Sequence, residues 1–204
     1  MAEDDNFIGF SPASARNRVP ILEALLGLLR GDEAVLEIGS GTGQHAVYFS
    51  QRLPHLRWLP SDVAQQLPLL QANLEAHQCD NIDPPLLVDL QQPQWSSGLS
   101  PVELIYTANT LHIISWAEVI SLFRGLSGVL RPAGRLMLYG PFRYNQGFTS
   151  EGNAQFDRWL KDRDPNSGIR DFEQVQALAH EAGLTLEADI CMPANNQLLV
   201  WQKA

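Results

Sequence analysis

Short apolar runs alternate with amphipathic segments along most of this chain, and this alternation restricts the fold more than any other feature of the sequence. Apolar runs of strand length joined by helices indicate parallel strands with helical crossovers. Only six residues separate the last two runs, which is too few for a crossover helix, so these two strands are expected to be antiparallel. The sequence therefore predicts an α/β fold with a seven-stranded, mostly parallel sheet, an antiparallel last strand and helices on both faces. The strands are expected at residues 34–38, 56–59, 86–88, 102–107, 135–139, 184–190 and 197–202.

Helices are expected between most of these strands. Ser115 and Glu118 have the spacing of a capping box before residues 117–130, and Asp171 offers a similar cap before residues 172–182. An earlier helix is expected to start at Ser11-Pro12 and to end at Gly31. Residues 1–10 are expected to form a flexible arm and residues 11–204 a single domain. Two further helices are expected at residues 43–53 and 67–78.

Composition excludes several classes of protein. The chain of 204 residues is 45% hydrophobic and only 18% charged, which excludes a largely disordered protein. Its formal charge of −9 argues against nucleic acid as the main partner, because phosphate binding needs a dense basic face. No run approaches about 18 consecutive apolar residues, and the acidic start lacks the basic region of a signal peptide. A cytoplasmic protein without a membrane span is therefore expected.

Metal binding is not predicted. The two cysteines, Cys79 and Cys191, are too few for a disulfide scaffold or a thiolate metal cage, although counting alone leaves one disulfide open. The five histidines are scattered, and none forms an H-x-x-x-H pair.

A glycine-rich turn follows the first predicted strand, in the order strand, turn, helix start. Its glycines let the backbone turn sharply and approach a ligand closely, and the helix start favours an anionic or polar group. A dinucleotide fingerprint, G-x-G-x-x-G, would need glycine at position 44, which is Gln44 here. The spacing resembles instead the E/D-x-G-x-G-x-G signature of enzymes that use S-adenosyl-L-methionine (SAM). A tight turn without a ligand is the alternative. The expected cofactor-binding residues are Glu37, Gly39, Ser40, Gly41, Gly43, Gln44 and His45.

Two carboxylates follow the next strands. Asp62 follows the second strand, 23 residues after Gly39, where it can accept hydrogen bonds from both ribose hydroxyls. Asp89 ends the third strand and could accept from the adenine amino group while Leu90 packs on the ring. Both acids lie at the carboxyl ends of strands, where open α/β sheets bind ligands. A helix cap for Asp62 and a solvated turn for Asp89 are the alternatives.

The loop after the fourth strand is expected to face the reactive end of the cofactor. Asn109 carries one acceptor and two donors and can orient the cofactor, but it cannot act as a base. His112 is the candidate catalytic base, with Tyr139 at the end of the fifth strand behind it. A buried histidine with a structural role is the competing interpretation.

The interval from Pro141 to Arg170 is long for an ordinary connection. It contains aromatic residues and a short amphipathic helix near residues 151–161, and we expect an ordered cover over the substrate pocket; a helix that only closes the core is the alternative. Arg143 in this segment could pair with a substrate anion or form a surface ion pair. Asn195 and Asn196 are expected to contact substrate, although turn chemistry also explains them.

Many segments of the chain together form a specific pattern: Ser11-Pro12, Arg16-Asn17, residues 36–46, Pro60-Ser61-Asp62, His112-Ile113 with Trp116, residues 138–141, residues 148–150, Phe156-Asp157, residues 163–165, residues 168–171 and residues 192–196. This pattern resembles the domain-of-unknown-function 938 family, the methyltransferase-like 26 proteins. The resemblance implies a Rossmann-like class I SAM-dependent methyltransferase fold, with SAM as cofactor, but it implies no substrate. The family pattern has Glu-Arg-Asn where this chain has Ala15-Arg16-Asn17. Arg16 is therefore expected to contact the cofactor and Asn17 the substrate; docking of the helix is the alternative for both.

The leading hypothesis is methyl transfer from SAM to an O, N or S atom of a small molecule. Two other functions stay open at this point: a SAM-binding sensor or assembly protein without catalysis, and, less favoured because of Gln44, a nicotinamide-dependent oxidoreductase.

Overall fold

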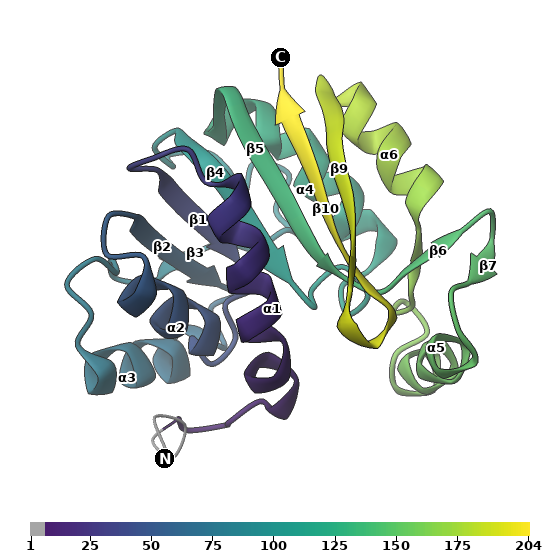
Figure 1. The fold of residues 1–204 in the computed structure, drawn as a ribbon, viewed down its shortest axis with the longest axis horizontal. Helices are drawn as coiled ribbons and strands as arrows, with labels where there is room; N and C mark the ends of the chain where they lie inside the picture. The colour runs from purple at the N-terminus through teal and green to yellow at the C-terminus, as the bar shows by residue number, and fades with distance from the viewer. Residues whose placement is uncertain (1–6) are drawn as a thin grey trace. The chain divides into compact units, whose positions relative to one another are not determined.

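The computed structural model describes residues 7–204, and its main feature is one seven-stranded sheet with the order β3-β2-β1-β4-β5-β10-β9 (Figure 1). β1 is parallel to β2 and β4, and β2 is parallel to β3, whereas β10 is antiparallel to both β5 and β9. The predicted fold class is confirmed. The strands are β1 (Ala34–Ile38), β2 (Arg57–Asp62), β3 (Leu86–Leu87), β4 (Val102–Ala108), β5 (Leu130–Gly140), β9 (Leu184–Met192) and β10 (Asn196–Lys203).

Six α-helices occur within residues 7–204, close to their expected positions. Ser115 and Glu118 form the predicted capping box, in which each side chain bonds the other residue's backbone N–H. The segment after β5 adds a helix and a small three-stranded sheet, β6 (Phe142–Tyr144), β7 (Gly147–Phe148) and β8 (Arg170–Asp171). The helices are α1 (Pro12–Leu28), α2 (Gln44–Arg52), α3 (Leu67–His77), α4 (Trp116–Val129), α5 (Glu151–Arg163) and α6 (Phe172–Glu181).

The chain forms two compact units. The first unit contains residues up to Asp89 together with Leu104–Tyr106, and the second contains Leu90–Glu103 and Thr107–Ala204. In the first unit α2 packs on β2 and beside α1. Its core includes the buried rings of Phe49, Trp58 and Tyr106, whose centroids lie 5.6 to 5.9 Å apart. Such mutually inclined rings contribute about 0.5–1.5 kcal/mol a pair beyond the area they bury.

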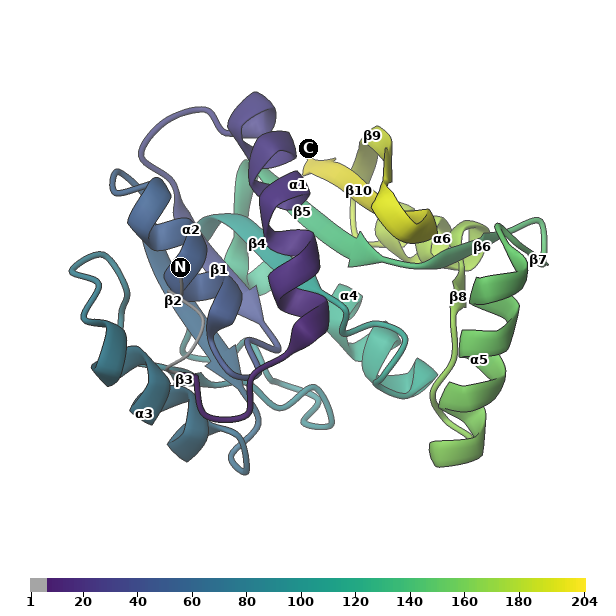
Figure 2. The same cartoon turned by 60° about the horizontal axis from the view of Figure 1, so that its bottom comes forward.

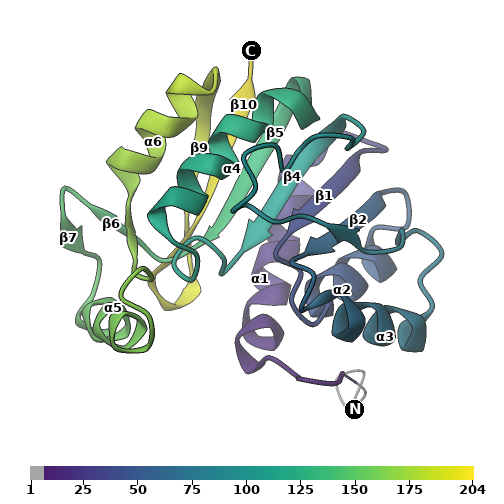
Figure 3. The same ribbon diagram turned by 180° about the vertical axis from the view of Figure 1, so that it is seen from behind.

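In the second unit, α4 and α6 cover one face of β5, β10 and β9 (Figure 3). The fully buried Trp201 of β10 meets Phe123 of α4 edge to face, and its indole N–H donates to Gln176 of α6 at 2.7 Å. One strand therefore ties both helices to the sheet.

The structure corrects two expectations. β5 begins at Leu130 rather than near Arg135, because Gly134 lets the carbonyls of Arg131 and Glu103 approach to where a Cβ would stand, 2.8 and 2.9 Å away. Asp171 stands at the start of α6 without capping it; its carboxylate pairs instead with Arg143.

The flexible arm expected over residues 1–10 stays a prediction. Residues 1–6 lie outside the described part of the chain. Residues 7–10 lie against α3, where Ile8 exchanges two hydrogen bonds with Asn73 and Phe7 stacks on His77.

Candidate functional site

The glycine turn after β1 has the backbone that its sequence requires. Gly39, Gly41 and Gly43 all have positive φ, from +57° to +79°. A Cβ on Gly43 would stand 2.9 Å from Leu70 of α3, so this glycine allows close helix packing. A Cβ on Gly41 would meet no atom within 4 Å, so open space lies beside this residue. Gly41 is therefore the point at which a ligand can approach the backbone of the turn.

Glu37 lies beneath this turn rather than at its surface. Its side chain is only 2% exposed, and its Oε2 accepts hydrogen bonds from the Trp58 indole and the Ser40 hydroxyl. Burial, opposed by these two bonds, raises the pKa of Glu37 to about 7. A direct contact between Glu37 and a cofactor, which the sequence predicted, would require the carboxylate to leave its donors. The structure gives Glu37 and Ser40 a supporting place under the turn.

Asp62, at the end of β2, lies directly against the turn. Its Oδ2 accepts the backbone N–H of Gly41 at 2.7 Å, and its Oδ1 accepts that of Val63 at 2.8 Å. Burial raises its pKa above the usual range for aspartate. A carboxylate has about four lone-pair sites, so each oxygen keeps one for a further donor. The structure thus brings Asp62 and Gly41 together, whereas Asp89 lies beyond β3 and is half-buried.

Gln44 and His45, both predicted to bind cofactor, are buried and bond to protein instead. The Gln44 amide accepts from the N–H of Ser11 at 2.5 Å and donates to the carbonyl of the same residue at 3.3 Å. Gln44 therefore holds the start of α1, which explains its presence where a dinucleotide fingerprint has glycine. Sequence reasoning missed this role because the two residues lie 33 positions apart.

His45 belongs to a buried polar chain. Its Nε2 lies 2.7 Å from Oδ1 of Asn17, and its Nδ1 lies 3.3 Å from the Tyr106 hydroxyl. Burial, with a smaller effect of Arg18, lowers the pKa of His45 to about 4, so the ring is neutral at pH 7. Asn17, predicted to bind substrate, is thereby engaged with α2. Its neighbour Arg16 is exposed and pairs with no residue among 7–204.

In the second unit, the loop after β4 is fastened by its backbone. The carbonyl oxygens of four successive residues accept hydrogen bonds from the segment that precedes α6. The Arg170 guanidinium donates to Leu111 and Ile114, Gly168 N–H donates to His112, and the Ser167 hydroxyl donates to Ile113. Arg170 was not singled out from the sequence, since nothing local shows that its guanidinium reaches Leu111 and Ile114, more than 50 residues away.

The His112 side chain is 5% exposed and meets the ring of Phe156 on α5 edge to face, with centroids 5.3 Å apart. A Cβ on Gly140 would stand 3.6 Å from its Nδ1. Burial, with a smaller effect of Arg170, lowers the pKa of His112 to about 4. Since alternate residues of a strand point to opposite faces, Tyr139 points away from the face on which His112 meets Gly140. The structure therefore does not bring these two predicted catalytic residues together.

Asn109 has a left-handed backbone, with φ of +57°, and its N–H donates to the carbonyl of Tyr139 at 2.9 Å. This bond ties the end of β4 to the end of β5.

The segment from residue 141 to 170 is ordered, with α5 beside β7 and β8 (Figure 2). Arg143, expected to meet a substrate anion, forms an ion pair with the buried Asp171. Asn195 has a left-handed backbone within a tight turn, and its carbonyl accepts from Asn153 of α5 at 3.0 Å. Asn196 donates to the carbonyl of Pro193. These contacts agree with the alternatives stated for these residues, an ion pair for Arg143 and turn chemistry for Asn195 and Asn196.

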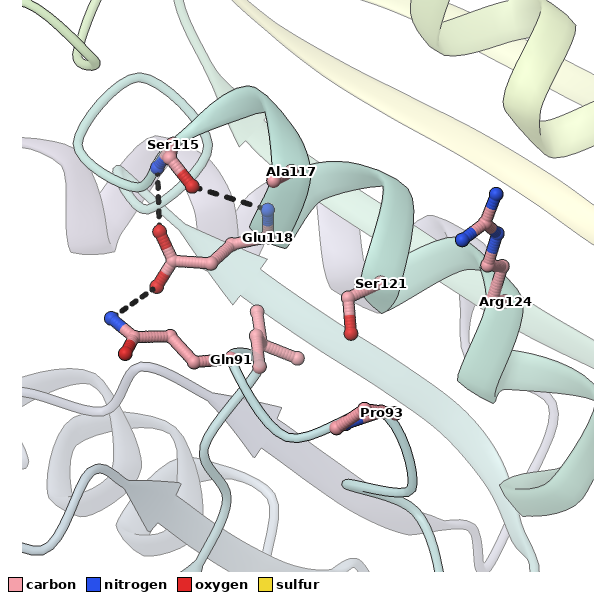
Figure 4. A pocket seen from close by; sticks show the side chains of 8 residues that line it. Gln91, Pro93, Ser115, Ala117, Glu118, Ser121 and Arg124 are labelled. Atoms are coloured by element: carbon pink, nitrogen blue, oxygen red, sulfur yellow. Dashed lines mark hydrogen bonds between the residues drawn. The ribbon is translucent and has the colours of Figure 1, made fainter.

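Leu90 lines a cavity of about 360 Å³ in the second unit (Figure 4). The opposite wall is the first half of α4, where the Glu118 carboxylate is occupied by the capping bond from Ser115 and by the Gln91 amide. The cavity is thus lined mainly by neutral or internally bonded groups. Its other lining residues are Pro93, Ala117, Ser121 and Arg124.

Within residues 7–204, no three His, Cys, Asp or Glu side chains converge as metal ligands. The helices of this described region are all too short or too polar to cross a membrane.

Solved methyltransferase structures have the same fold. An O-methyltransferase family protein from Burkholderia thailandensis is 16% identical, with a TM-score of 0.79 over 94% of this chain and 57% of that one. The mitomycin 7-O-methyltransferase MmcR is 15% identical, with a TM-score of 0.79 over 94% and 54%. CalO1, a methyltransferase in calicheamicin biosynthesis solved in its SAH-bound form, is 15% identical, with a TM-score of 0.73 over 94% and 54%. This chain spans little more than half the length of these structures.

The family assignment rests on nearly the whole chain. The model of the family described as "Protein of unknown function (DUF938)" matches residues 9–203, as the resemblance in the sequence implied. The chain therefore belongs to the DUF938 family.

Proposed function

We propose that this protein is a SAM-dependent methyltransferase that acts on a small molecule. One observation carries the proposal: Asp62 holds the N–H of Gly41 while Gly41 itself faces open space. The carboxylate at the end of β2 suits the ribose of SAM, and the unobstructed backbone of Gly41 beside it suits the polar amino-acid tail. The fold, shared with proteins named as O-methyltransferases, supports the same function.

The first unit supplies most of the proposed cofactor contacts. Asp62 accepts from the ribose hydroxyls, and the backbone of Gly39, Gly41 and Gly43 lies along the amino-acid tail. Arg16, an exposed cation without a partner among residues 7–204, pairs with the tail carboxylate. We assign the adenine contacts to Asp89 and Leu90, and a further polar contact to Asn109.

When bound, SAM would supply a methyl group that an O, N or S nucleophile attacks in line, with S-adenosylhomocysteine as the leaving group. The protein's contributions to such a step are alignment and exclusion of water. His112 is the proposed base where the nucleophile carries a proton. Because its pKa is lowered to about 4, the ring is neutral at pH 7 and has a nitrogen lone pair that can accept a proton, although as a weaker base than an ordinary histidine. We retain Tyr139 as the second candidate base, and Asn17, Arg143, Asn195 and Asn196 as candidate substrate contacts.

Ligand-induced stabilisation tests the cofactor. A ligand at 100 times its Kd stabilises a fold by about 2.7 kcal/mol. S-adenosylhomocysteine should therefore raise Tm, whereas NADH should not. A shift with NADH alone would favour the oxidoreductase hypothesis and overturn the proposal.

Catalysis needs a separate test, since a SAM-binding sensor would give the same thermal shift. The native protein, incubated with SAM and a panel of small phenols, carboxylic acids, amines and thiols, should yield a methylated product by mass spectrometry. His112→Ala should abolish it without lowering affinity for S-adenosylhomocysteine. Cofactor binding without any product across the panel would favour the sensor.

A further inference from the structure

Residues Phe7–Ser11, here called the N-terminal strap, cross the glycine turn and are held by two buried amide side chains. At one end, Asn73 of α3 accepts from the N–H of Ile8 at 2.9 Å and donates to the Ile8 carbonyl at 3.0 Å. At the other end, Gln44 makes the same two-way contact with the backbone of Ser11. The amides bind the strap as a neighbouring strand would.

The same two amides also hold the glycine turn. Asn73 donates its second amide proton to the carbonyl of Thr42 at 2.9 Å, and Gln44 accepts from the Thr42 hydroxyl at 3.1 Å. A Cβ on Gly9, in the middle of the strap, would stand 3.4 Å from the methyl of Thr42. Strap and turn are therefore fixed to each other through Thr42.

Burial of apolar side chains explains this position only in part. Phe7 is half-buried and stacks on His77, whereas Ile8 is 61% exposed and Phe10 is 40% exposed. Asn73 is only 1% exposed, and its side-chain oxygen and one amide proton are both bonded to the backbone of Ile8. The amide contacts therefore add directional anchors to the contact that Phe7 makes.

The strap leads directly into the part of α1 that carries Arg16. Asn17, the next residue, is bonded to His45 in the first turn of α2. Two features that favour an anion, the N-terminus of α2 and the exposed Arg16, which has no partner among residues 7–204, thus come from the elements that the strap joins. The amino-acid tail of SAM carries a carboxylate, whereas its adenosine part is uncharged.

We propose that Asn73 and Gln44 are positioning residues for the cofactor: they fix the strap, and the strap forms the wall around the amino-acid tail. This inference rests on the proposed function, since it assumes that SAM binds at the glycine turn. It predicts that the strap discriminates between ligands with and without the tail.

The test compares S-adenosylhomocysteine with 5′-methylthioadenosine, which has the same nucleoside and sulfur but lacks the tail. Asn73→Leu, close in shape but unable to bond the strap, should weaken S-adenosylhomocysteine at least tenfold, mainly through faster dissociation. It should change the affinity for 5′-methylthioadenosine less than twofold. Gln71→Leu is the matched control, because this half-buried amide of α3 bonds only Glu75 among the described residues. Calorimetry measures the affinity for each ligand, and stopped-flow kinetics measures the dissociation rate.

The possible results distinguish a failure of the role given to the strap from a failure of the proposed function. Equal weakening of both ligands, or no weakening of either, would overturn the role of the strap while leaving the proposed function intact. Failure of the native protein to bind either ligand would overturn the proposed function itself. If Asn73→Leu does not fold, hydrogen exchange on the native protein replaces it. The amides of Ile8 and Ser11 should then gain protection with S-adenosylhomocysteine but not with 5′-methylthioadenosine, and equal protection by both would overturn the inference.

Discussion

Gly168 donates its backbone N–H to the carbonyl oxygen of His112 at 2.9 Å, across 56 positions of the chain. This bond belongs to the row of four that fastens residues 111–114 to the segment before α6. The loop that carries the proposed base is therefore fixed by backbone acceptors, so its own side chains remain available for other contacts.

Arg170 is expected to stabilise this loop more than Ser167 or Gly168 does. Its guanidinium donates to the carbonyls of Leu111 and Ile114 and also to that of Asn166. Arg170→Ala should lower the free energy of unfolding by about 1.5–3 kcal/mol, the range for hydrogen bonds to a charged group. The Gly168 amide should also exchange faster with deuterium. Arg158→Ala, on the exposed side of α5, should change neither quantity. An Arg170→Ala protein with native exchange at Gly168 would contradict this account.

Two substitutions at Asp62 separate support of the glycine turn from ligand binding. Asp62→Asn keeps an oxygen for the N–H of Gly41 but loses the charge and the acceptor for the N–H of Val63, so it should weaken S-adenosylhomocysteine by at least about 1.4 kcal/mol, a factor of ten, with a smaller loss of stability than Asp62→Ala. Asp62→Ala removes the bond to Gly41 as well and should lower both affinity and stability. Calorimetry and urea unfolding measure the two effects. Native affinity in both variants would remove Asp62 from the cofactor site.

The raised pKa of Glu37 should make the folded protein less stable as the pH rises. Its pKa is raised from 4.5 to about 7 in the folded protein, so between these values the folded state holds a proton that the unfolded state has lost. Stability from this group is complete below pH 4.5 and is lost as pH rises through 7, by a total on the order of 3 kcal/mol.

Glu37→Gln removes that titration while keeping an oxygen for Trp58 and Ser40. Its stability relative to the native protein should therefore increase from pH 5 to about pH 7 and then level off, as measured by urea unfolding. A difference that stays constant over this range would show that Glu37 does not titrate as described.

Substitution by alanine should have opposite effects on the stability of the protein at two helical glycines. A Cβ on Gly27 of α1 meets nothing within 4 Å, so Gly27→Ala should stabilise the protein by up to about 1 kcal/mol through helix propensity. A Cβ on Gly125 of α4 would stand 2.2 Å from Nε1 of the buried Trp95, so Gly125→Ala should cost about 1–3 kcal/mol through overpacking. Thermal unfolding of both variants checks the contrast, and stabilisation by Gly125→Ala would contradict it.

The sequence predicted the strands and helices well because their signals are local. β1 lies at the predicted residues since an unbroken apolar run leads straight into the glycine turn. The proximity of Asp62 to this turn also followed from a general rule, that strand ends of a parallel sheet meet at one edge.

What the sequence could not predict depends on distant partners. Glu37 was expected to meet a ligand, but its donor Trp58 lies 21 residues away on the neighbouring strand. Asp171 has good capping chemistry, yet Arg143 draws its carboxylate away. The amide of Asn73 is a suitable partner for backbone, but nothing local shows that its partner is Ile8.

β10 is the last strand in sequence, yet it lies between β5 and β9. During synthesis, β5 and β9 are therefore both made before β10, the strand that lies between them. Until Asn196–Lys203 arrive, β5 and β9 each present a bare row of backbone donors and acceptors, the kind of template on which neighbouring nascent chains aggregate. Slow synthesis of this final strand would prolong that hazard, and a chaperone that shields open strand edges would shorten it.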